Sequence, residues 1–136
     1  MSRENLEIYK RSLAAINARE FPDELAEELL AVGFHAENAS TAVTDKAYFG
    51  REGVREWIRD MFEGLNDDAQ LEIEEVLVES DDFVLAQLRI VGHGARSGAP
   101  VTLRWVDVTW FEDRKMTRGV GYLRRSEAFK AVGLAE

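Results

Sequence analysis

One acidic residue inside an apolar strand is the feature of this sequence that most directly suggests chemistry. Asp107 stands within residues 101–111, whose β-branched and aromatic content is typical of a buried strand. Because strand side chains alternate between two faces, Asp107 shares its face with Leu103, Trp105, Thr109 and Phe111. A carboxylate among such neighbours must be paired, hydrogen-bonded or shifted toward its neutral form. Asp107 is therefore a candidate for proton transfer in a pocket.

Two registers of the preceding strand predict opposite surroundings for this acid. In one register Gln87 and Arg89 lie on the face of Asp107, and an ion pair with Arg89 is expected. A shift by one residue brings Ala86 and Leu88 to that face instead. The acid then loses its charge partner, and burial raises its pKa. The sequence leaves both registers open.

The strand after Asp107 contains a tyrosine that a tight turn at Asp113-Arg114 brings close to the acid. This turn pairs Trp105 with Tyr122, so Tyr122 is expected on the face of Asp107. There it either orients a ligand through its hydroxyl group or serves as a core or rim tyrosine.

The sequence predicts neither metal nor cofactor. His35 and His93 are the only histidines, and no cysteine is present. Nothing around the two histidines has metal-ligand spacing, and zinc takes three or four protein ligands. The absence of cysteine excludes disulfides, thiolate metal sites and thiol nucleophiles.

The elements that must position these residues follow from hydrophobic periodicity. Helical spacing begins at Leu6, with Ser2 as the expected N-cap, and a second helix starts at Pro22 and is expected to end at Gly33. A short strand at 34–38 and an irregular stretch at 39–49 precede a third helix after Gly50. Strands are predicted near 70–79, 82–93, 101–111 and 115–123, and a last helix spans about 126–132. Helices followed by an antiparallel meander predict an α+β fold in a single domain, residues 1–136.

Several aromatic and apolar residues are candidates for the wall of a pocket. Trp57, Met61 and Phe62 lie at helical spacing, which is typical of core residues, although pocket wall and core merge in such a fold. Tyr48 and Phe49 follow the irregular stretch and are candidates for a lid, with a solvated connection as the alternative.

Composition limits the classes of partner. The chain has 136 residues, a net charge of −9 and 46% hydrophobic residues. Nucleic acid and anionic membrane surfaces would repel this charge, so neither is expected as a partner. No apolar run approaches the roughly 20 residues that span a bilayer, and the N-terminus lacks a signal-peptide core. A cytoplasmic protein is expected.

Four stretches resemble the nuclear transport factor 2-like superfamily, especially its SnoaL-like and ketosteroid-isomerase-like branches. They are residues 13–17, 49–57, 108–118 and 127–134, and the resemblance extends over residues 6–134. It implies a curved sheet forming an open cone, closed on one side by three N-terminal helices, with a short C-terminal helix. It also implies a ligand pocket in the mouth of the cone, and often a homodimer through the outer face of the sheet, where Val106, Val108 and Trp110 are expected.

The resemblance carries over to single residues only in part. The acid that helps to hold the oxyanion in ketosteroid isomerases corresponds to Asp107. The general base of that family corresponds to Asn38, which cannot accept a proton, and its helix-one tyrosine corresponds to Ser12, one turn from Tyr9. SnoaL-like cyclases fit better, because they rely on a strand-borne aspartate. In the epoxide-hydrolase branch an Arg and an Asp lie two residues apart, whereas Arg104 and Asp107 lie three apart.

Together these observations favour a small-molecule-binding protein, an isomerase or cyclase that moves a proton next to the carbonyl of a hydrophobic substrate through Asp107. The expected ligand-binding residues are Asn38, Tyr122, Trp105, Trp57, Met61, Phe49 and Tyr9. The alternative is a non-catalytic ligand-binding or dimerisation domain on the same fold.

Overall fold

The computed structural model describes residues 2–38 and 46–135 and has the predicted α+β architecture. The helices are α1 (Ser2–Ala18), α2 (Asp23–Leu29), α3 (Gly50–Phe62) and α4 (Arg125–Ala131). The strands are β1 (Leu30–Asn38), β2 (Ala47–Phe49), β3 (Gln70–Glu79), β4 (Phe83–His93), β5 (Pro100–Glu112) and β6 (Lys115–Tyr122).

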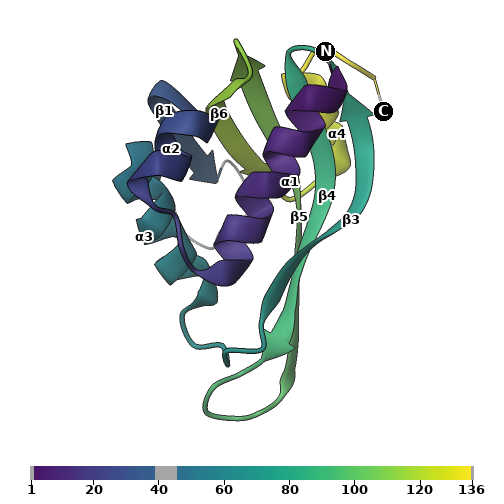
Figure 1. The fold of residues 1–136 in the computed structure, drawn as a ribbon. Helices are drawn as coiled ribbons and strands as arrows, with labels where there is room; N and C mark the ends of the chain where they lie inside the picture. The colour runs from purple at the N-terminus through teal and green to yellow at the C-terminus, as the bar shows by residue number, and fades with distance from the viewer. Residues whose placement is uncertain (1, 39–45, 136) are drawn as a thin grey trace.

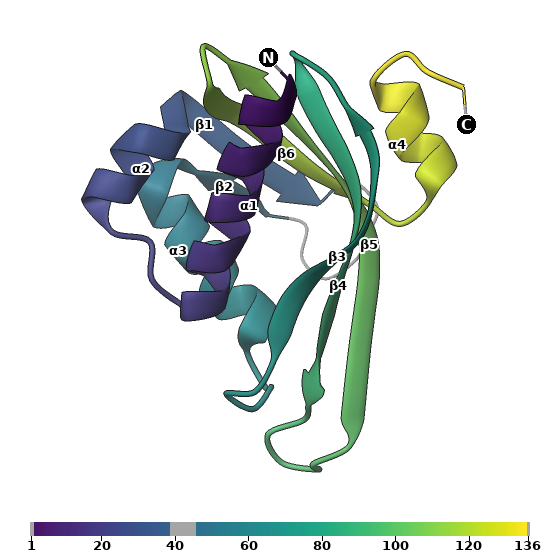
Figure 2. The ribbon, with the colours of Figure 1, turned by 45° about the vertical axis from the view of Figure 1, so that its right-hand side comes forward.

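The six strands form one curved, unclosed sheet in the order β2-β1-β6-β5-β4-β3 (Figure 1). β1 and β6 are parallel, and every other neighbouring pair is antiparallel. Helices α1, α2 and α3 lie on one side of the sheet and α4 lies on the other (Figure 2). The three N-terminal helices therefore cover one face of the curved sheet, as expected for this fold.

Two asparagines fix α1 against the sheet. The Asn5 side chain donates to the carbonyl of Asp81 at 2.8 Å. Asn17 exchanges two hydrogen bonds with the backbone of Leu71, at 2.8 and 2.7 Å. Since these contacts lie near both ends of α1, the middle of the helix is held at a set distance from the sheet.

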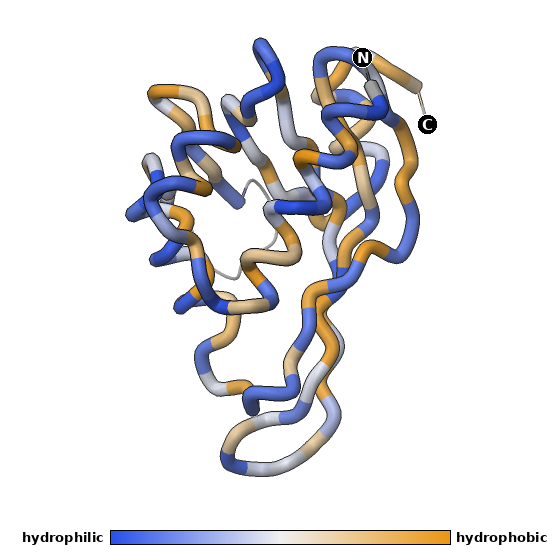
Figure 3. Tube along the Cα trace, in the orientation of Figure 1, coloured by the Kyte–Doolittle hydropathy of each residue, from blue (hydrophilic) through white to orange (hydrophobic). Residues whose placement is uncertain are grey.

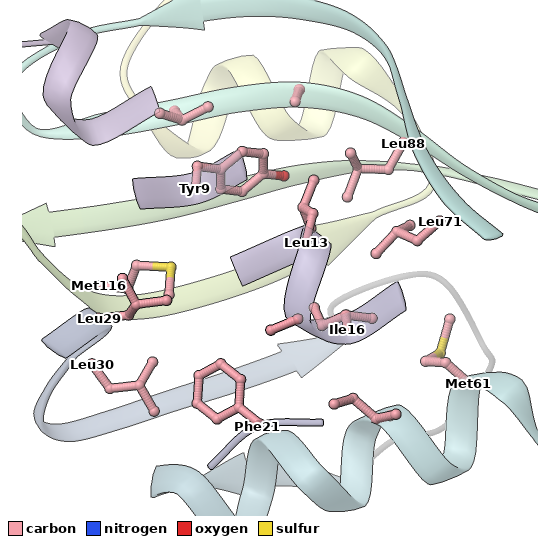
Figure 4. Close-up of a cluster of buried hydrophobic side chains, with 14 of the residues drawn as sticks. Tyr9, Leu13, Ile16, Phe21, Leu29, Leu30, Met61, Leu71, Leu88 and Met116 are labelled. Atoms are coloured by element: carbon pink, nitrogen blue, oxygen red, sulfur yellow. The ribbon is translucent and has the colours of Figure 1, made fainter. Parts of the chain in front are cut away.

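The main core lies between the helices and the concave face of the sheet. Hydrophobic and hydrophilic residues alternate along the strands (Figure 3), as expected when one strand face is buried. Tyr9, Leu13 and Ile16 of α1 pack toward Leu71 and Leu88 of the strands (Figure 4). A second, smaller cluster lies on the convex face, where Ala128 of α4 covers parts of β4 and β5.

Three local expectations prove wrong. Gly33 does not end α2, because β1 already begins at Leu30; its φ of +84° accompanies an irregularity of β1 between Leu30 and His35. The end of the irregular stretch forms β2, while residues 39–45 lie outside the described part. Ser2 is the first residue of α1 rather than a residue before it.

No helix in the described ranges is long and apolar enough to cross a membrane. Across the same residues, no three potential His, Cys, Asp or Glu ligands come together as a metal site.

Candidate ligand pocket

A cavity of about 90 Å³ lies between the helices and the concave face of the sheet. Pockets for drug-sized ligands measure roughly 300–1,000 Å³, so this cavity suits a compact molecule. Its wall is mostly apolar and aromatic. The residues that line it are Tyr9, Ser12, Leu13, Ile16, Phe21, Leu30, Phe34, Ala36, Glu37, Asn38, Tyr48, Val54, Trp57, Leu71, Leu88, Trp105, Asp107, Thr109, Met116, Gly119 and Gly121.

The strand register places Asp107 in this cavity without a charge partner. Asp107 pairs with Ala86, and Trp105 pairs with Leu88. Arg89 pairs with Arg104 in the ladder, and its guanidinium binds Glu72 at 2.8 Å instead of Asp107. Of the two registers that the sequence allows, the structure therefore has the one without the ion pair.

Two hydroxyl groups hold one oxygen of the carboxylate. The Tyr9 hydroxyl and the Thr109 hydroxyl each donate to Asp107 Oδ2 at 2.8 Å. The other oxygen, Oδ1, accepts no hydrogen bond from the residues that the structure describes, and it is not closed off by protein. Oδ1 is thus the oxygen that a molecule in the cavity can reach.

Burial dominates the protonation equilibrium of this acid. It raises the pKa of Asp107 from an ordinary 3.8 to about 6, against the hydrogen bonds from Thr109 and Tyr9, which lower it. Burial, followed by the charge of Asp107, also raises the pKa of the Tyr9 hydroxyl well above 10, so Tyr9 stays a donor. Asp107 therefore exchanges its proton near neutral pH.

The expected site residues divide between the cavity and other parts of the fold. Asn38, Trp105, Trp57 and Tyr9 line the cavity together with Asp107. Trp57 and Trp105 meet edge to face, with ring centroids 6.3 Å apart. Asn38 reaches the wall because β1 runs beside β6, where Asn38 is level with Gly121.

Tyr122 lies on the opposite face from Asp107, which corrects the predicted register. An irregularity between Trp110 and Phe111 shifts the β5–β6 pairing, so Tyr122 faces Val106 and Asp107 faces Gly121. Thr117 is the additional residue on β6. The tight turn itself is as predicted, with Glu112 opposite Lys115.

Met61 and Phe49 also lie outside the cavity wall. Met61 is 5% exposed within the main core. Phe49 is 67% exposed and stacks on His35, because side chains alternate along β2. Its neighbour Tyr48 points inward and lines the cavity, and its hydroxyl donates to Asp60 at 2.7 Å.

Two glycines that the sequence reasoning did not single out make room for the cavity. Gly119 and Gly121 occupy the inward positions of β6, opposite Thr109 and Asp107. Glycine inside a strand often marks the close approach of a ligand or backbone. The two glycines of Gly119-Val120-Gly121 in a predicted strand could therefore have indicated the cavity wall.

Comparison with known proteins places the chain in a family. Residues 9–119 match the SnoaL-like domain. The chain belongs to the SnoaL-like family. A search of curated proteins finds no match.

Solved structures with the same fold share little sequence with this SnoaL-like protein. A hypothetical protein of ketosteroid-isomerase-like fold from Catenulispora acidiphila, in complex with trimethylamine, is 18% identical, with a TM-score of 0.66 over 94% of this chain and 93% of that one. TerC, co-crystallised with polyporic acid, is 18% identical, with a TM-score of 0.69 over 94% and 96%. A candidate SnoaL-like polyketide cyclase from Jannaschia sp. CCS1 is 21% identical, with a TM-score of 0.63 over 88% and 85%.

Proposed function

We propose that this protein binds a compact, largely hydrophobic carbonyl compound and moves a proton next to its carbonyl group through Asp107. The observation that carries the proposal is the state of this carboxylate. One oxygen is oriented by two hydroxyl donors, while the other is open to an apolar cavity. General bases work best when their pKa lies near the working pH, and burial brings the pKa of Asp107 to about 6.

The proposed reaction needs only residues of the cavity wall. Asp107 Oδ1 removes a proton from the carbon next to the carbonyl, and the C–H electron pair forms the enolate. In a β,γ-unsaturated ketone Asp107 then returns the proton to the far carbon of the conjugated enolate, which isomerises the substrate. Alternatively, the enolate carbon attacks a second carbonyl of the same molecule, and the new alkoxide takes the proton from Asp107 as the ring closes. The amide of Asn38 in the cavity wall can donate to the enolate oxygen, while the Tyr9 hydroxyl keeps its hydrogen bond to Asp107 Oδ2.

The known ligands of fold neighbours support a small-molecule role. One of the compared structures is a complex with trimethylamine, and another was co-crystallised with polyporic acid. The cavity volume of about 90 Å³ argues for a substrate smaller than a steroid or a fused polyketide in the side-chain arrangement seen here.

Isotope exchange tests the proposed chemistry without knowledge of the natural substrate. Butan-2-one and cyclopent-3-enone, both compact ketones, are incubated with the protein in D₂O, and loss of the proton signal next to the carbonyl is followed by NMR. We expect exchange faster than in buffer alone and its loss in Asp107→Asn. The matched control is Asp67→Asn, which removes an exposed carboxylate that does not line the cavity. Equal exchange rates in wild type and Asp107→Asn contradict the proposal.

A second candidate function is ligand binding without turnover. By the family resemblance Asn38 corresponds to the base of ketosteroid isomerases. Of the two acids that line the cavity, Glu37 is paired with Arg118 and only Asp107 lacks a charge partner. If a ketone binds tightly in a calorimetric titration but its protons do not exchange in D₂O, this second candidate function is supported instead.

We further propose a homodimer through the part of the convex sheet face that α4 leaves open. Val106 and Val108, expected in this interface, are 1% and 0% exposed in the cluster that includes Ala128 of α4. The open part contains a row of cross-strand neighbours, Phe49, His35, Arg118 and Trp110. Arg118 lies 5.0 Å from the ring of Trp110, and Phe49 stacks on His35, so the row presents aromatic surface to a partner.

A further inference from the structure

The charges in the cavity wall are one-sided. Among the described residues that line it, Asp107 and Glu37 are acidic, and none is Lys, Arg or His. Glu37 is neutralised by Arg118 at 2.7 Å, whereas Asp107 has only neutral hydroxyl donors. At neutral pH the cavity therefore holds one desolvated negative charge without a counter-ion, which is an unfavourable arrangement until a cation enters.

The rest of the wall also suits a cation. Six aromatic rings line the cavity, those of Tyr9, Phe21, Phe34, Tyr48, Trp57 and Trp105. Faces of aromatic rings attract alkylammonium groups, with Trp the most effective, and the attraction grows when water is excluded. The net charge of −9 adds a long-range attraction for cations.

We propose that the cavity selects a compact protonated tertiary amine, whose N–H donates to Asp107 Oδ1 while its alkyl groups lie against the aromatic wall. This inference rests on the ligand cavity of the proposed function but not on proton transfer. An amine bound in this way occupies the oxygen that the proposed reaction uses, so it acts as a competitive inhibitor of ketone exchange.

The pH dependence follows from the groups that face Asp107. These are the Tyr9 hydroxyl from α1, the Thr109 hydroxyl on β5, and Ala86 and Gly121 on the flanking strands. The remaining titratable groups of the wall are Glu37, paired with Arg118, and Tyr48, whose hydroxyl donates to Asp60. Asp107 is therefore the acid of the wall that has no charge partner, and its pKa of about 6 sets the expected midpoint for the pH dependence of amine binding.

Three probes of matched shape test the selection by calorimetry. They are N,N-dimethylethylamine, which is cationic, 2-methylbutane, its neutral isostere, and propanoate, an anion of similar size; all three are small enough for a cavity of about 90 Å³. Near pH 7.5 we expect the amine to bind at least tenfold more tightly than 2-methylbutane, and propanoate not to bind. At about pH 4.5 the preference for the amine falls at least tenfold, because Asp107 is then protonated in the free protein.

Variants and a second readout keep the test decisive. Asp107→Asn is expected to bind the amine and the neutral isostere equally, while Asp67→Asn retains the preference. In the wild type, saturation with the amine should lower the carboxyl pKa of Asp107 below its value in the free protein, which NMR measures even if Asp107→Asn fails to fold. Equal binding of amine and isostere by the wild type, or an unchanged carboxyl pKa, overturns the inference. If the protein prefers the amine but does not catalyse ketone exchange, the proposed function is wrong and this inference stands. If it catalyses exchange but does not prefer the amine, this inference is wrong and the proposed function stands.

Discussion

At the scale of single residues, the environment of Asp107 results from a competition between burial and two hydrogen bonds. The donors Tyr9 and Thr109 favour the carboxylate, yet burial dominates and leaves the pKa at about 6. The two hydroxyl groups therefore set how far the pKa of Asp107 lies below the value that burial alone would give. Each hydroxyl group can be removed by a substitution that keeps the size of the side chain.

Tyr9→Phe and Thr109→Val each remove one donor to Asp107 Oδ2. We expect each variant to raise the pKa of Asp107 above the wild-type value, because the carboxylate loses a stabilising hydrogen bond while burial is retained. The measurement is a carbon-detected NMR titration of the carboxyl group. An unchanged or lower pKa in both variants contradicts the assigned hydrogen bonds.

Stability should depend on pH through the same residue. The pKa of Asp107 is higher in the folded protein than the ordinary 3.8 of an unfolded chain, so the folded state holds the proton more tightly. The contribution of Asp107 to the free energy of unfolding is therefore full below pH 3.8 and is lost as pH rises through about 6. From the two pKa values the loss is on the order of 2–3 kcal/mol.

Asp107→Asn removes this dependence, since the Asn side-chain oxygen can still accept from Tyr9 and Thr109. We expect the variant to be more stable than wild type at pH 8 and to lose that advantage at pH 4. Urea denaturation at both pH values measures the difference. A variant less stable than wild type at pH 8 means that the charged carboxylate stabilises the fold.

The candidate acid could be predicted from the sequence, but its surroundings could not. A carboxylate in an apolar strand is visible in the pattern around Asp107. Its partner depends on the β4–β5 loop, where Gly94 N–H bonds Ala99 at 2.9 Å and the ladder closes with His93 opposite Pro100. Ser97 Oγ also accepts from Ala99 N–H at 3.1 Å, and Gly98 has a φ of +70°. The hydrophobic pattern of the strands is compatible with either register, and a shift of one residue changes which face Arg89 occupies.

At the scale of elements, one additional residue in β6 decides which side chains enter the cavity. Because Thr117 shifts the β5–β6 pairing, Gly121 rather than Val120 faces Asp107, and Tyr122 is moved to the convex face. Bulges re-aim side chains near binding sites, and this one leaves no alternation in the sequence from which it could be predicted.

Two glycine substitutions should have opposite effects on stability. A Cβ at Gly119 meets Thr109 Oγ1 at 3.6 Å and Ala36 at 3.9 Å, which are ordinary contacts. A Cβ at Gly53 of α3 lies 2.6 Å from the backbone of Tyr48, which cannot move without shifting β2.

We expect Gly119→Ala to stabilise the fold by about 0.5–1 kcal/mol, because a strand glycine loses more backbone entropy on folding. It should also weaken ligand binding by narrowing the cavity. Gly53→Ala should destabilise by about 1–3 kcal/mol through overpacking. Thermal unfolding compares the two variants, and equal destabilisation by both contradicts the described packing of α3 and β6.

At the scale of the whole molecule, the sheet has two different faces. Helices α1 to α3 lie on one face, where residues of α1 and α3 line the cavity, and α4 covers only part of the other. The order of elements and the α+β class could be predicted, because periodicity of two and of 3.6 residues separates strands from helices. Which face each helix covers could not be predicted from periodicity, since α4 is short and its few apolar residues fit either face.

The open part of the convex face predicts the assembly. Phe49→Glu places a charge at the exposed end of the row formed by Phe49, His35, Arg118 and Trp110, and Phe49 does not line the cavity. We expect a wild-type dimer by light scattering and a monomer for this variant, with ligand binding retained. Val32→Glu, at an exposed position of β1 outside the row, is the control and should remain dimeric. A monomeric wild type contradicts the proposed interface.

The carboxyl pKa of Asp107 in the ligand-free protein shows whether this acid lies in the cavity without a charge partner. A carbon-detected NMR titration, with Asp107→Asn to assign the signal, measures it without any assumption about the substrate. We expect a value of about 6, because Asp107 is shielded from bulk water in the cavity wall and has no counter-ion. A value at or below 3.8 would show that Asp107 is paired or solvated, and both the proton-transfer function and the amine selection would lose their basis.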